Sequence, residues 1–492
     1  MSYFIGRTTM RIPGPDFPKN CALLLFLWIV AQPLFAQSPI VGHISFARGS
    51  NAAQQPGAAP RILGQGAEIY QGDNIQTTER SFVIIDFSDG AKVTVRPNSS
   101  FTVDHYDNQS ASPKAELSLY EGGIRASSGG IAQKNPENFQ VKAGAVVVKA
   151  QQADYSLRMC NEDCAQEKPA TEAPPVKTDQ SVVARIVDIK GEVSAKNVAD
   201  KNSKDRLLSL GGPLYSEDTL RSKKDSYALM LFRDGEKITL QADSEMVIAQ
   251  YHFQHEGKKD QALYRLTTGG MRALTGSIGK TNREAYSIDT PVATIGIRGT
   301  GFDLSCVGDC VAENNTSPQK IERGQVEGLY SHVWQGQIAL INESGEHLLT
   351  VPDSNYIAAP LTAPKALSDL PGILQNIPVP RPDQNNTNVQ QLFAAKTSQG
   401  TPSGSYVTVH KGHVRVDNGN GKGSVDLGKD EVGYANQKGE TVRLTRQQAF
   451  QSQDVYPLPN ESDTDQGYNN TYSPLKDDYD ASGKDGYQCV SK

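Results

Sequence analysis

Two stretches of the chain align with each other at a constant spacing of 145 residues. Asp73 falls on Asp218 and Phe87 falls on Phe232, and the apolar pattern between these positions is retained. Self-similarity at a fixed spacing indicates that one supersecondary unit occurs twice. Residues shared by both copies are therefore expected to build the scaffold, and residues present in one copy are candidates for function.

The composition favours an exported β-protein over a nucleic-acid-binding one. Lys and Arg number 49 against 55 Asp and Glu, without the basic stripe that phosphate neutralisation requires. Nucleic acid is therefore not expected as a partner. The chain has 492 residues with 44 Gly and 27 Pro, which is long enough for several domains and typical of many short strands and turns.

The N-terminal segment has the pattern of a secretory signal. Arg7 and Arg11 precede an apolar run over residues 21–30, and cleavage is expected after Ala36. A membrane anchor is the alternative, but the apolar run is short for roughly 30 Å of hydrocarbon. We expect residues 1–36 to be a signal peptide and the mature chain to be periplasmic, or else surface-exposed or secreted. It is not expected to be an integral membrane protein.

Five cysteines follow the signal segment. Cys160 and Cys164 form a C-x3-C pair, and Cys306 and Cys310 form a second pair at a similar place in the other copy. In an oxidising compartment such pairs are expected to close local loops as disulfides. A four-thiolate zinc site is the alternative and would require the two copies to meet there. Cys489 has no obvious partner.

Shifts in composition divide the chain into segments. Residues 165–180 are rich in Pro, Glu and Lys, residues 360–400 are rich in Pro and Asn, and the last stretch has no apolar period. The expected segments are a signal peptide (1–36), a first domain (37–164), a linker (165–180), a second domain (181–359), a linker (360–400), a small β-rich module (401–450) and a disordered tail (451–492). The β-rich module echoes the end of the second domain and is interpreted as a partial third copy.

The apolar period within each copy is two, as strands require. The stretch 82–95 reads as a hairpin, because Asp89-Gly90 suits the positive φ values of a type I′ turn. Asp73, Asp86 and Asp89 could be taken as a carboxylate cluster, but turn and rim roles explain them better. The sequence predicts an all-β protein of two tandem antiparallel β-sandwiches or short β-solenoids, followed by a partial C-terminal β repeat.

Several short motifs together resemble the FecR domain family. They are Gly72-Asp73-Asn74-Ile75-Gln76-Thr77, the Asp89-Gly90 turn, Pro97-Asn98-Ser99-Ser100 and, in the second copy only, the run from Thr290 to Phe302. The resemblance covers most of residues 40–359. It implies an all-β, periplasmic, non-catalytic module, as in regulators that receive a signal from an outer-membrane transporter. Those regulators carry an anti-sigma segment and a membrane span where this chain shows a signal-like segment, so direct control of a sigma factor is not expected.

Arg298, Gly299 and Thr300 form the candidate binding site. At the spacing of the cysteines, Gln152-Ala153-Asp154 stand in their place in the first copy, which has lost this motif. A guanidinium between glycines could clamp a carboxylate or phosphate through two parallel hydrogen bonds. The alternative is an internal role, in which the arginine bonds groups of its own domain.

No enzyme motif is present, and neither catalysis nor a cofactor is expected. His252 and His255 are three residues apart, which on a strand points them to opposite faces and argues against a shared metal. We expect a protein-interaction or signal-sensing module whose partners are other envelope proteins. Binding of peptidoglycan or another glycan is the alternative, although Trp334 is the only tryptophan outside the signal segment.

Overall fold

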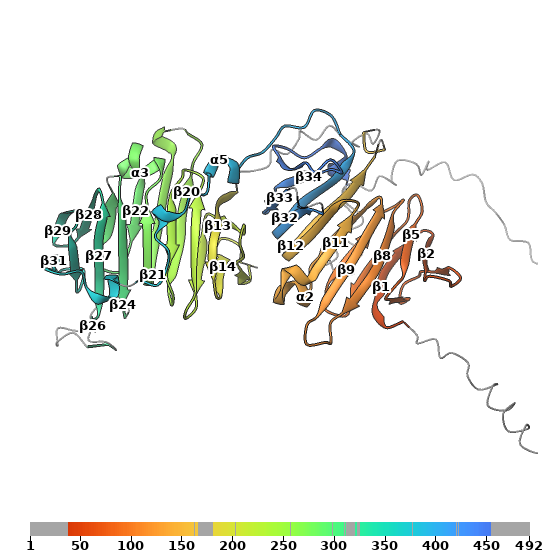
Figure 1. Cartoon of the computed structure of the whole chain (residues 1–492), viewed down its shortest axis with the longest axis horizontal. Helices are drawn as coiled ribbons and strands as arrows, with labels where there is room; N and C mark the ends of the chain where they lie inside the picture. Colours follow the sequence, from red (N-terminus) through yellow and green to blue (C-terminus); the bar gives the residue numbers. More distant parts are fainter. Residues whose placement is uncertain are drawn as a thin grey trace, which may run out of the picture. The chain divides into compact units, whose positions relative to one another are not determined.

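The structure is a computed structural model. It describes residues 38–453, apart from 162, 166–180, 202, 256, 298, 309, 311–319, 322–324, 376, 420 and 422. The described part is all-β, as predicted, with two large sheet systems and only short helices (Figure 1). No helix in these residues is both long and apolar enough to cross a membrane. The expected signal peptide and Cys489 lie outside the described residues.

The first repeat is one system of hydrogen-bonded strands that doubles back on itself. Its order is β3-β2-β5-β8-β9-β11-β12-β10-β7-β6-β1-β4, and the pairs are antiparallel except β9 with β11. The strands are β1 (Ile40–Arg48), β2 (Asn51–Gln54), β3 (Arg61–Ile62), β4 (Glu68–Tyr70), β5 (Asn74–Thr77), β6 (Phe82–Phe87), β7 (Lys92–Val95), β8 (Ser100–Asp107), β9 (Lys114–Glu121), β10 (Gly123–Ser127), β11 (Phe139–Ala143) and β12 (Val146–Cys160), with α2 (Gly130–Lys134) and η1 (Pro136–Asn138) before β11.

The second repeat follows the same plan. Its strands are β13 (Val182–Lys190), β14 (Val193–Asn197), β15 (Arg206–Leu207), β16 (Pro213–Tyr215), β17 (Asp218–Ser222), β18 (Tyr227–Phe232), β19 (Lys237–Leu240), β20 (Glu245–His252), β21 (Gln261–Leu274), β22 (Tyr286–Asp289), β23 (Thr294–Ile297), β24 (Gly301–Val307), β27 (Gly328–Gln335), β28 (Gln337–Asn342), β29 (Gly345–Thr350), β30 (Ser354–Ile357) and β31 (Lys365–Ala366). Its short helices are α3 (Ser277–Thr281), η2 (Gly257–Lys259) and η3 (Arg283–Ala285). β25 (Lys320–Ile321) and β26 (Gln325–Val326) pair only with each other among the described strands.

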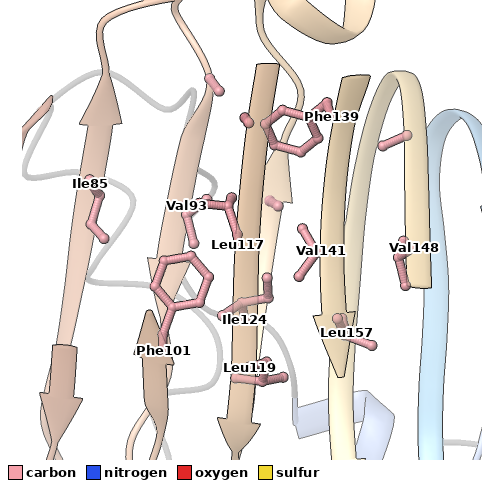
Figure 2. Close-up of a cluster of buried hydrophobic side chains, with 14 of the residues drawn as sticks. Ile85, Val93, Phe101, Leu117, Leu119, Ile124, Phe139, Val141, Val148 and Leu157 are labelled. Atoms are coloured by element: carbon pink, nitrogen blue, oxygen red, sulfur yellow. The ribbon is translucent and has the colours of Figure 1, made fainter. Parts of the chain in front are cut away.

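Each repeat is held together by one apolar core, to which strands from both ends of its strand order contribute side chains. In the first repeat the alternating apolar residues of β8 and β9 share one core with those of β6, β7, β10 and β12 (Figure 2). The second repeat has its own core of the same kind. Its buried side chains include Phe232, Tyr264 and Phe302. Each such side chain contributes about 1.5–3 kcal/mol when it is fully buried.

The acidic residues of the hairpin turns are structural. Gly90 has a φ of 86° and Gly235 a φ of 87°, but neither Asp89 nor Asp234 has a positive φ, so the predicted type I′ turn is wrong. Phe87 exchanges hydrogen bonds with Ala91 and Gly90, which makes the connection a three-residue loop with the glycine in the left-handed region. Asp89 Oδ1 accepts the N–H of Ala91 at 2.8 Å. Asp73 is fully buried and forms an ion pair with Arg61, and Asp218 pairs in the same way with Arg206 in the second repeat. These contacts support the interpretation of the aspartates as turn and rim residues.

The C-terminal strands complete the first repeat. They are β32 (Gly404–Asn418), β33 (Ser424–Leu427), β34 (Val432–Ala435) and β35 (Thr441–Leu444). β32 runs antiparallel to β12 over its whole length, from Asn418 opposite Val146 to Gly404 opposite Cys160, and both strands are labelled in Figure 1. In the second repeat β27 and β28 fill this place beside β24 and β23. The echo between residues 401–450 and the end of the second repeat therefore marks two equivalent closing elements.

The Pro- and Asn-rich segment before β32 lies against the second repeat. Arg272 Nη1 donates to the carbonyl of Val379 at 3.2 Å, and Thr239 Oγ1 donates to the carbonyl of Pro380 at 3.0 Å. The segment carries α4 (Gly372–Gln375), η4 (Pro382–Gln384) and α5 (Val389–Leu392), and η5 (Ala449–Gln453) ends the described chain. The segment thus connects the second repeat back to the sheet of the first.

Candidate functional site

The described part of the sequence-predicted binding motif has a structural role. Arg298 lies outside the described residues. The N–H of Thr300 donates to Thr275 Oγ1 at 2.8 Å, and its hydroxyl donates to the carbonyl of Gln337 at 2.6 Å. Thr300 is completely buried, so its hydroxyl joins β24 to β28 and is not offered to a ligand. Gly299 sits in the turn between β23 and β24 with a φ of 70°.

The backbone geometry of the turn at Gly299 identifies its counterpart in the first repeat. This counterpart differs by one residue from the one that the cysteine spacing gave. Gln152 has a φ of 45°, matching Gly299. A Cβ on Gly412 would lie 2.1 Å from the carbonyl oxygen of Gln152, as a Cβ on Gly336 would lie 2.5 Å from that of Gly299. The equivalents of Arg298, Gly299 and Thr300 are therefore residues 151–153, one position earlier than the alignment at the cysteine spacing placed them.

The same shift separates the two disulfides. The predicted bonds between Cys160 and Cys164 and between Cys306 and Cys310 are both formed. Cys160 lies opposite Gly404 in the strand register, whereas the corresponding position in the second repeat is Val307 and not Cys306. Successive residues of a strand point to opposite faces. The first disulfide accordingly packs in a small cluster with C-terminal residues, and the second packs in the main core of its repeat.

The end of the second repeat carries an exposed apolar surface, which we call the tail surface. It comprises Ile341 on β28, Leu348 on β29 and Val351 in the following turn, which are 45%, 51% and 48% exposed. Leu348 lies opposite Ala339, and Ile341 lies opposite Glu346, so Ile341 and Leu348 are diagonal neighbours on one face of the sheet. Apolar side chains gathered in this way are typical of interaction surfaces.

A free strand edge borders the tail surface. Among the described strands, β29 has a residue-by-residue pairing register with β28 alone. An open edge presents backbone N–H and C=O groups that a partner strand can bond. The tail surface therefore combines backbone hydrogen-bonding capacity with exposed apolar side chains.

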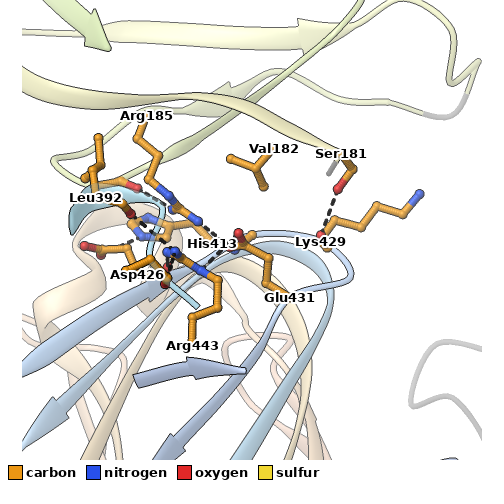
Figure 3. A network of polar contacts seen from close by, with 12 residues as sticks. Ser181, Val182, Arg185, Leu392, His413, Asp426, Lys429, Glu431 and Arg443 are labelled. Carbon is orange, nitrogen blue, oxygen red and sulfur yellow. Dashed lines mark hydrogen bonds and ion pairs between the residues drawn. The ribbon is translucent and has the colours of Figure 1, made fainter. Parts of the chain in front are cut away.

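Part of the equivalent end of the first repeat contacts the second repeat, and this contact is the junction surface. It is formed where β13 and the β15–β16 loop of the second repeat meet β12 and β32–β34 (Figure 3). Arg185 Nη2 donates to Glu431 Oε2, and both side chains are fully buried. Ser181 Oγ donates to the carbonyl of Lys429 at 3.1 Å. The N–H of Lys429 in turn donates to the hydroxyl of Tyr215 at 2.8 Å.

Charges inside the junction surface are mutually compensated. Burial acts to raise the pKa of Glu431, but the Arg185 and Arg443 guanidiniums outweigh it, so the pKa of this carboxyl lies below its ordinary value. Arg443 Nε lies 3.1 Å from Glu431 Oε1, and burial lowers the pKa of Arg443 to about 10. A buried carboxylate between two guanidiniums makes the contact specific for one docking geometry.

A buried acidic cluster occurs in the second repeat alone. Glu236 is completely buried and accepts hydrogen bonds from the hydroxyls of Tyr264 and Tyr286, both at 2.5 Å. Burial and the neighbouring Asp234 carboxyl raise the pKa of Glu236 well above its ordinary value. The group has no exposed surface, so no substrate reaches it. It is a candidate for a pH-dependent contribution to stability.

Sites of other kinds find little support in the described residues. No group of three or more His, Cys, Asp and Glu side chains there could hold a metal ion. A cavity of about 210 Å³ is lined by residues that include Arg233, Tyr251 and His252, and it is smaller than most small-molecule sites. Trp334 donates its indole N–H to Asp303 at 3.1 Å, and the Arg381 guanidinium lies 4.3 Å from its ring. That ring face is therefore not open for stacking on a sugar.

Comparison with known proteins confirms the resemblance seen in the sequence. The family model described as FecR protein matches residues 73–168 and residues 218–327, so the chain contains two FecR-like regions in tandem. No curated protein matches the chain. Two crystal structures of a putative anti-sigma factor from Parabacteroides distasonis ATCC 8503, at 1.65 and 2.50 Å resolution, match with 12% identity and a TM-score of 0.21. Each match covers 30% of this chain and 57% of the other.

Proposed function

We propose that the chain is an exported, non-catalytic interaction module of the bacterial cell envelope, related to envelope signal transduction. The observation that carries the proposal is the tail surface, where Ile341, Leu348 and Val351 are exposed beside the open edge of β29. The tandem FecR match supports a regulatory setting, because the family resemblance implies signal-receiving modules.

Export is part of the proposal. The N-terminal segment has the composition of a signal peptide, and disulfides persist mainly in oxidising compartments. The partner is proposed to be another envelope protein, since the exposed groups are apolar side chains and backbone amides. These groups suit a protein surface better than a glycan, which would require open aromatic platforms.

Site-specific photocrosslinking tests this function. A photoreactive amino acid replaces Leu348 in cells that produce the chain, and the matched control replaces Tyr120, which is 62% exposed on β9 of the first repeat. We expect a discrete protein adduct, identified by mass spectrometry, from position 348 and not from position 120. Equal crosslinking at the two positions, or retention of the chain on purified peptidoglycan in place of a protein adduct, would reject the proposed function.

A further inference from the structure

The junction surface and the tail surface are equivalent parts of two repeats. Glu431 directly precedes β34 and accepts the N–H of Gly428 at 2.8 Å. Asp353 directly precedes β30 and accepts the N–H of Thr350 at 2.8 Å. Glu431 is 1% exposed because the second repeat covers it, whereas Asp353 is exposed. The second repeat therefore displays, uncovered, the surface that the first repeat uses at the junction.

The start of the first repeat displays the matching half of the contact. Val182 lies opposite Tyr215 at the start of β13, and Ile40 lies opposite Tyr70 at the start of β1. Val182 is completely buried at the junction surface, but Ile40 is 55% exposed. We call the exposed start of the first repeat, formed by β1 and the loop before β4, the head surface.

The position of the head surface that corresponds to Arg185 is occupied by a histidine. Arg185 lies opposite Pro213, and His43 lies opposite Glu68 at the corresponding place in the first repeat. Arg185 is completely buried and His43 is exposed. An imidazole is thus available at the head surface to hydrogen-bond Asp353 of the tail surface, beside Glu68 on the neighbouring strand.

We propose that a second copy of this chain docks its head surface onto the tail surface, repeating between molecules the contact that joins the two repeats within one molecule. The inference rests on the proposed interaction function and specifies the partner. At the junction Val182 lies against Gly428, where an added Cβ would come within 2.7 Å of Val182 Cγ2. The equivalent position to Gly428 is Thr350, so Ile40 of one copy faces Thr350 of the next, and the two copies must stand further apart there than the repeats do at the junction. His43 takes the place of Arg185 opposite the acidic group.

Compared with the junction surface, the head and tail surfaces carry more apolar residues at equivalent positions. Leu348 lies opposite Ala339 at the position where Asp426 lies opposite Arg415, and Ile40 replaces Val182. Such a contact is heterologous, because each copy uses a different surface at each end. Head-to-tail addition leaves one free head and one free tail, and the assembly therefore lengthens with concentration.

Disulfide trapping tests the geometry directly. Ile40→Cys and Thr350→Cys are made in separate chains in which Cys21 and Cys489 are serine, and the purified proteins are mixed and oxidised. We expect a covalent dimer from this mixture. Tyr120→Cys mixed with Thr350→Cys is the control, because Tyr120 is exposed and is outside the head surface. Dimer yields equal to the control would overturn the proposal.

Sedimentation velocity over a range of concentrations tests the association without crosslinks. The wild-type chain is expected to form larger species as concentration rises, and Ile40→Asp is expected to weaken association about tenfold or more by placing an acid beside Asp353. Ile40→Lys, an equally polar change of opposite charge, should weaken it less. A wild-type chain that stays monomeric at all concentrations would reject self-docking.

The two proposals fail separately. If position 348 crosslinks to a different envelope protein while the chain stays monomeric, the interaction function stands and self-docking is rejected. If the adduct from position 348 is a dimer of this chain, both are supported. If position 348 gives no protein adduct and the chain stays monomeric, both are rejected.

Discussion

Arg185 on β13 and Glu431 before β34 form a buried ion pair that ties the second repeat to the strands completing the first. The pair joins two residues far apart in the sequence across the junction surface. Gly211, at the adjoining loop, accepts a hydrogen bond from Arg185 through its carbonyl at 2.9 Å. The pair thus defines one docking geometry between the repeats.

Removal of one member of this pair should destabilise the junction. Glu431→Ala leaves Arg185 and Arg443 buried without their counter-charge, which typically costs about 3–5 kcal/mol in the free energy of unfolding. Asp353→Ala is the matched control at the tail surface, where the carboxylate is exposed, and it should cost less than about 1 kcal/mol. Urea unfolding of the three proteins measures both effects. Equal losses in the two variants would contradict the structural assignment.

Acidification should loosen the same junction. The pKa of Glu431 in the folded chain lies below its ordinary value of 4.5, because the guanidiniums outweigh the effect of burial. A depressed folded-state pKa contributes stability above the unfolded-state pKa, and this stability is lost as the pH falls through the folded-state value. The protection of β13 and β34 amides against hydrogen exchange, relative to the intrinsic exchange rate at each pH, should therefore fall below pH 4.5 in the wild type. In Glu431→Gln the loss of protection over this range should be smaller.

The buried Glu236 should act in the opposite direction. Burial raises its folded-state pKa well above 4.5, so the folded chain holds the carboxyl protonated over a range where the unfolded chain ionises it. Its contribution to stability is complete below pH 4.5 and decreases as the pH rises towards the folded-state pKa. As the pH rises over that range, the melting temperature of the wild type should fall relative to that of Glu236→Gln. Thermal unfolding at a series of pH values checks this.

A second variant controls for the polar cluster around Glu236. Ala91, Leu117 and Phe139 occupy the corresponding positions of the first repeat, as the strand pairings show. The triple change Glu236→Ala, Tyr264→Leu and Tyr286→Phe copies that apolar arrangement into the second repeat. It should likewise remove the dependence on pH. An unchanged pH profile in both variants would show that another group is responsible.

Local signals predicted much of each repeat. The hairpin connection at Asp89-Gly90, the alternating strands beside it and both C-x3-C disulfides were predicted from adjacent residues and are present. These features depend on the φ preferences of turn residues, on the alternation of apolar and polar residues and on short loops, and each of these is determined by a few neighbouring residues. The repeat spacing extended the prediction from one copy to the other.

Pairings between strands far apart in the chain could not be predicted from the sequence. β32 closes the first repeat after an intervening second repeat, and no local pattern specifies which strand it joins. The shift of one residue between the cysteine spacing and the strand register was also hidden, because positive φ at Gln152 is not encoded by a glycine. The tail surface gave no motif, since the exposure of Leu348 follows only from the fold, and Asp353 becomes informative only when its covered equivalent Glu431 is known.

Deletion of the C-terminal strands should unfold the first repeat selectively. A chain ending at residue 403 lacks β32, so β12 keeps β10 and β11 but loses the strand along its other edge, and the packing around Val148 and Leu157 is exposed. Hydrogen exchange measured by mass spectrometry should show lost protection in β6–β12 and retained protection in β18–β24. A chain ending after Gln453 is the control and should keep the protection of both repeats. Loss of protection confined to the second repeat would contradict the pairing.

The disulfides should protect their cysteines from alkylation and stabilise different parts of the chain. Without reductant, only Cys489 of the processed chain should react with an alkylating agent, because the other four cysteines are bonded in pairs. Closing so short a loop is worth about 2 kcal/mol in the chain-entropy description. Removal of the first bond by Cys160→Ser and Cys164→Ser should loosen the packing against Phe450 at the C-terminal end.

Removal of the second disulfide, between Cys306 and Cys310, shows whether each disulfide stabilises its own surroundings. Cys306 and Cys310 pack in the core of the second repeat, so their replacement by serine should lower protection there and leave the cluster around Phe450 unchanged. Hydrogen exchange of the two double variants distinguishes these outcomes. If removal of the first bond lowered protection across the main core of the first repeat and left the cluster around Phe450 unchanged, the placement of the two disulfides on opposite strand faces would be wrong, and with it the one-residue shift that aligns Gln152 with Gly299.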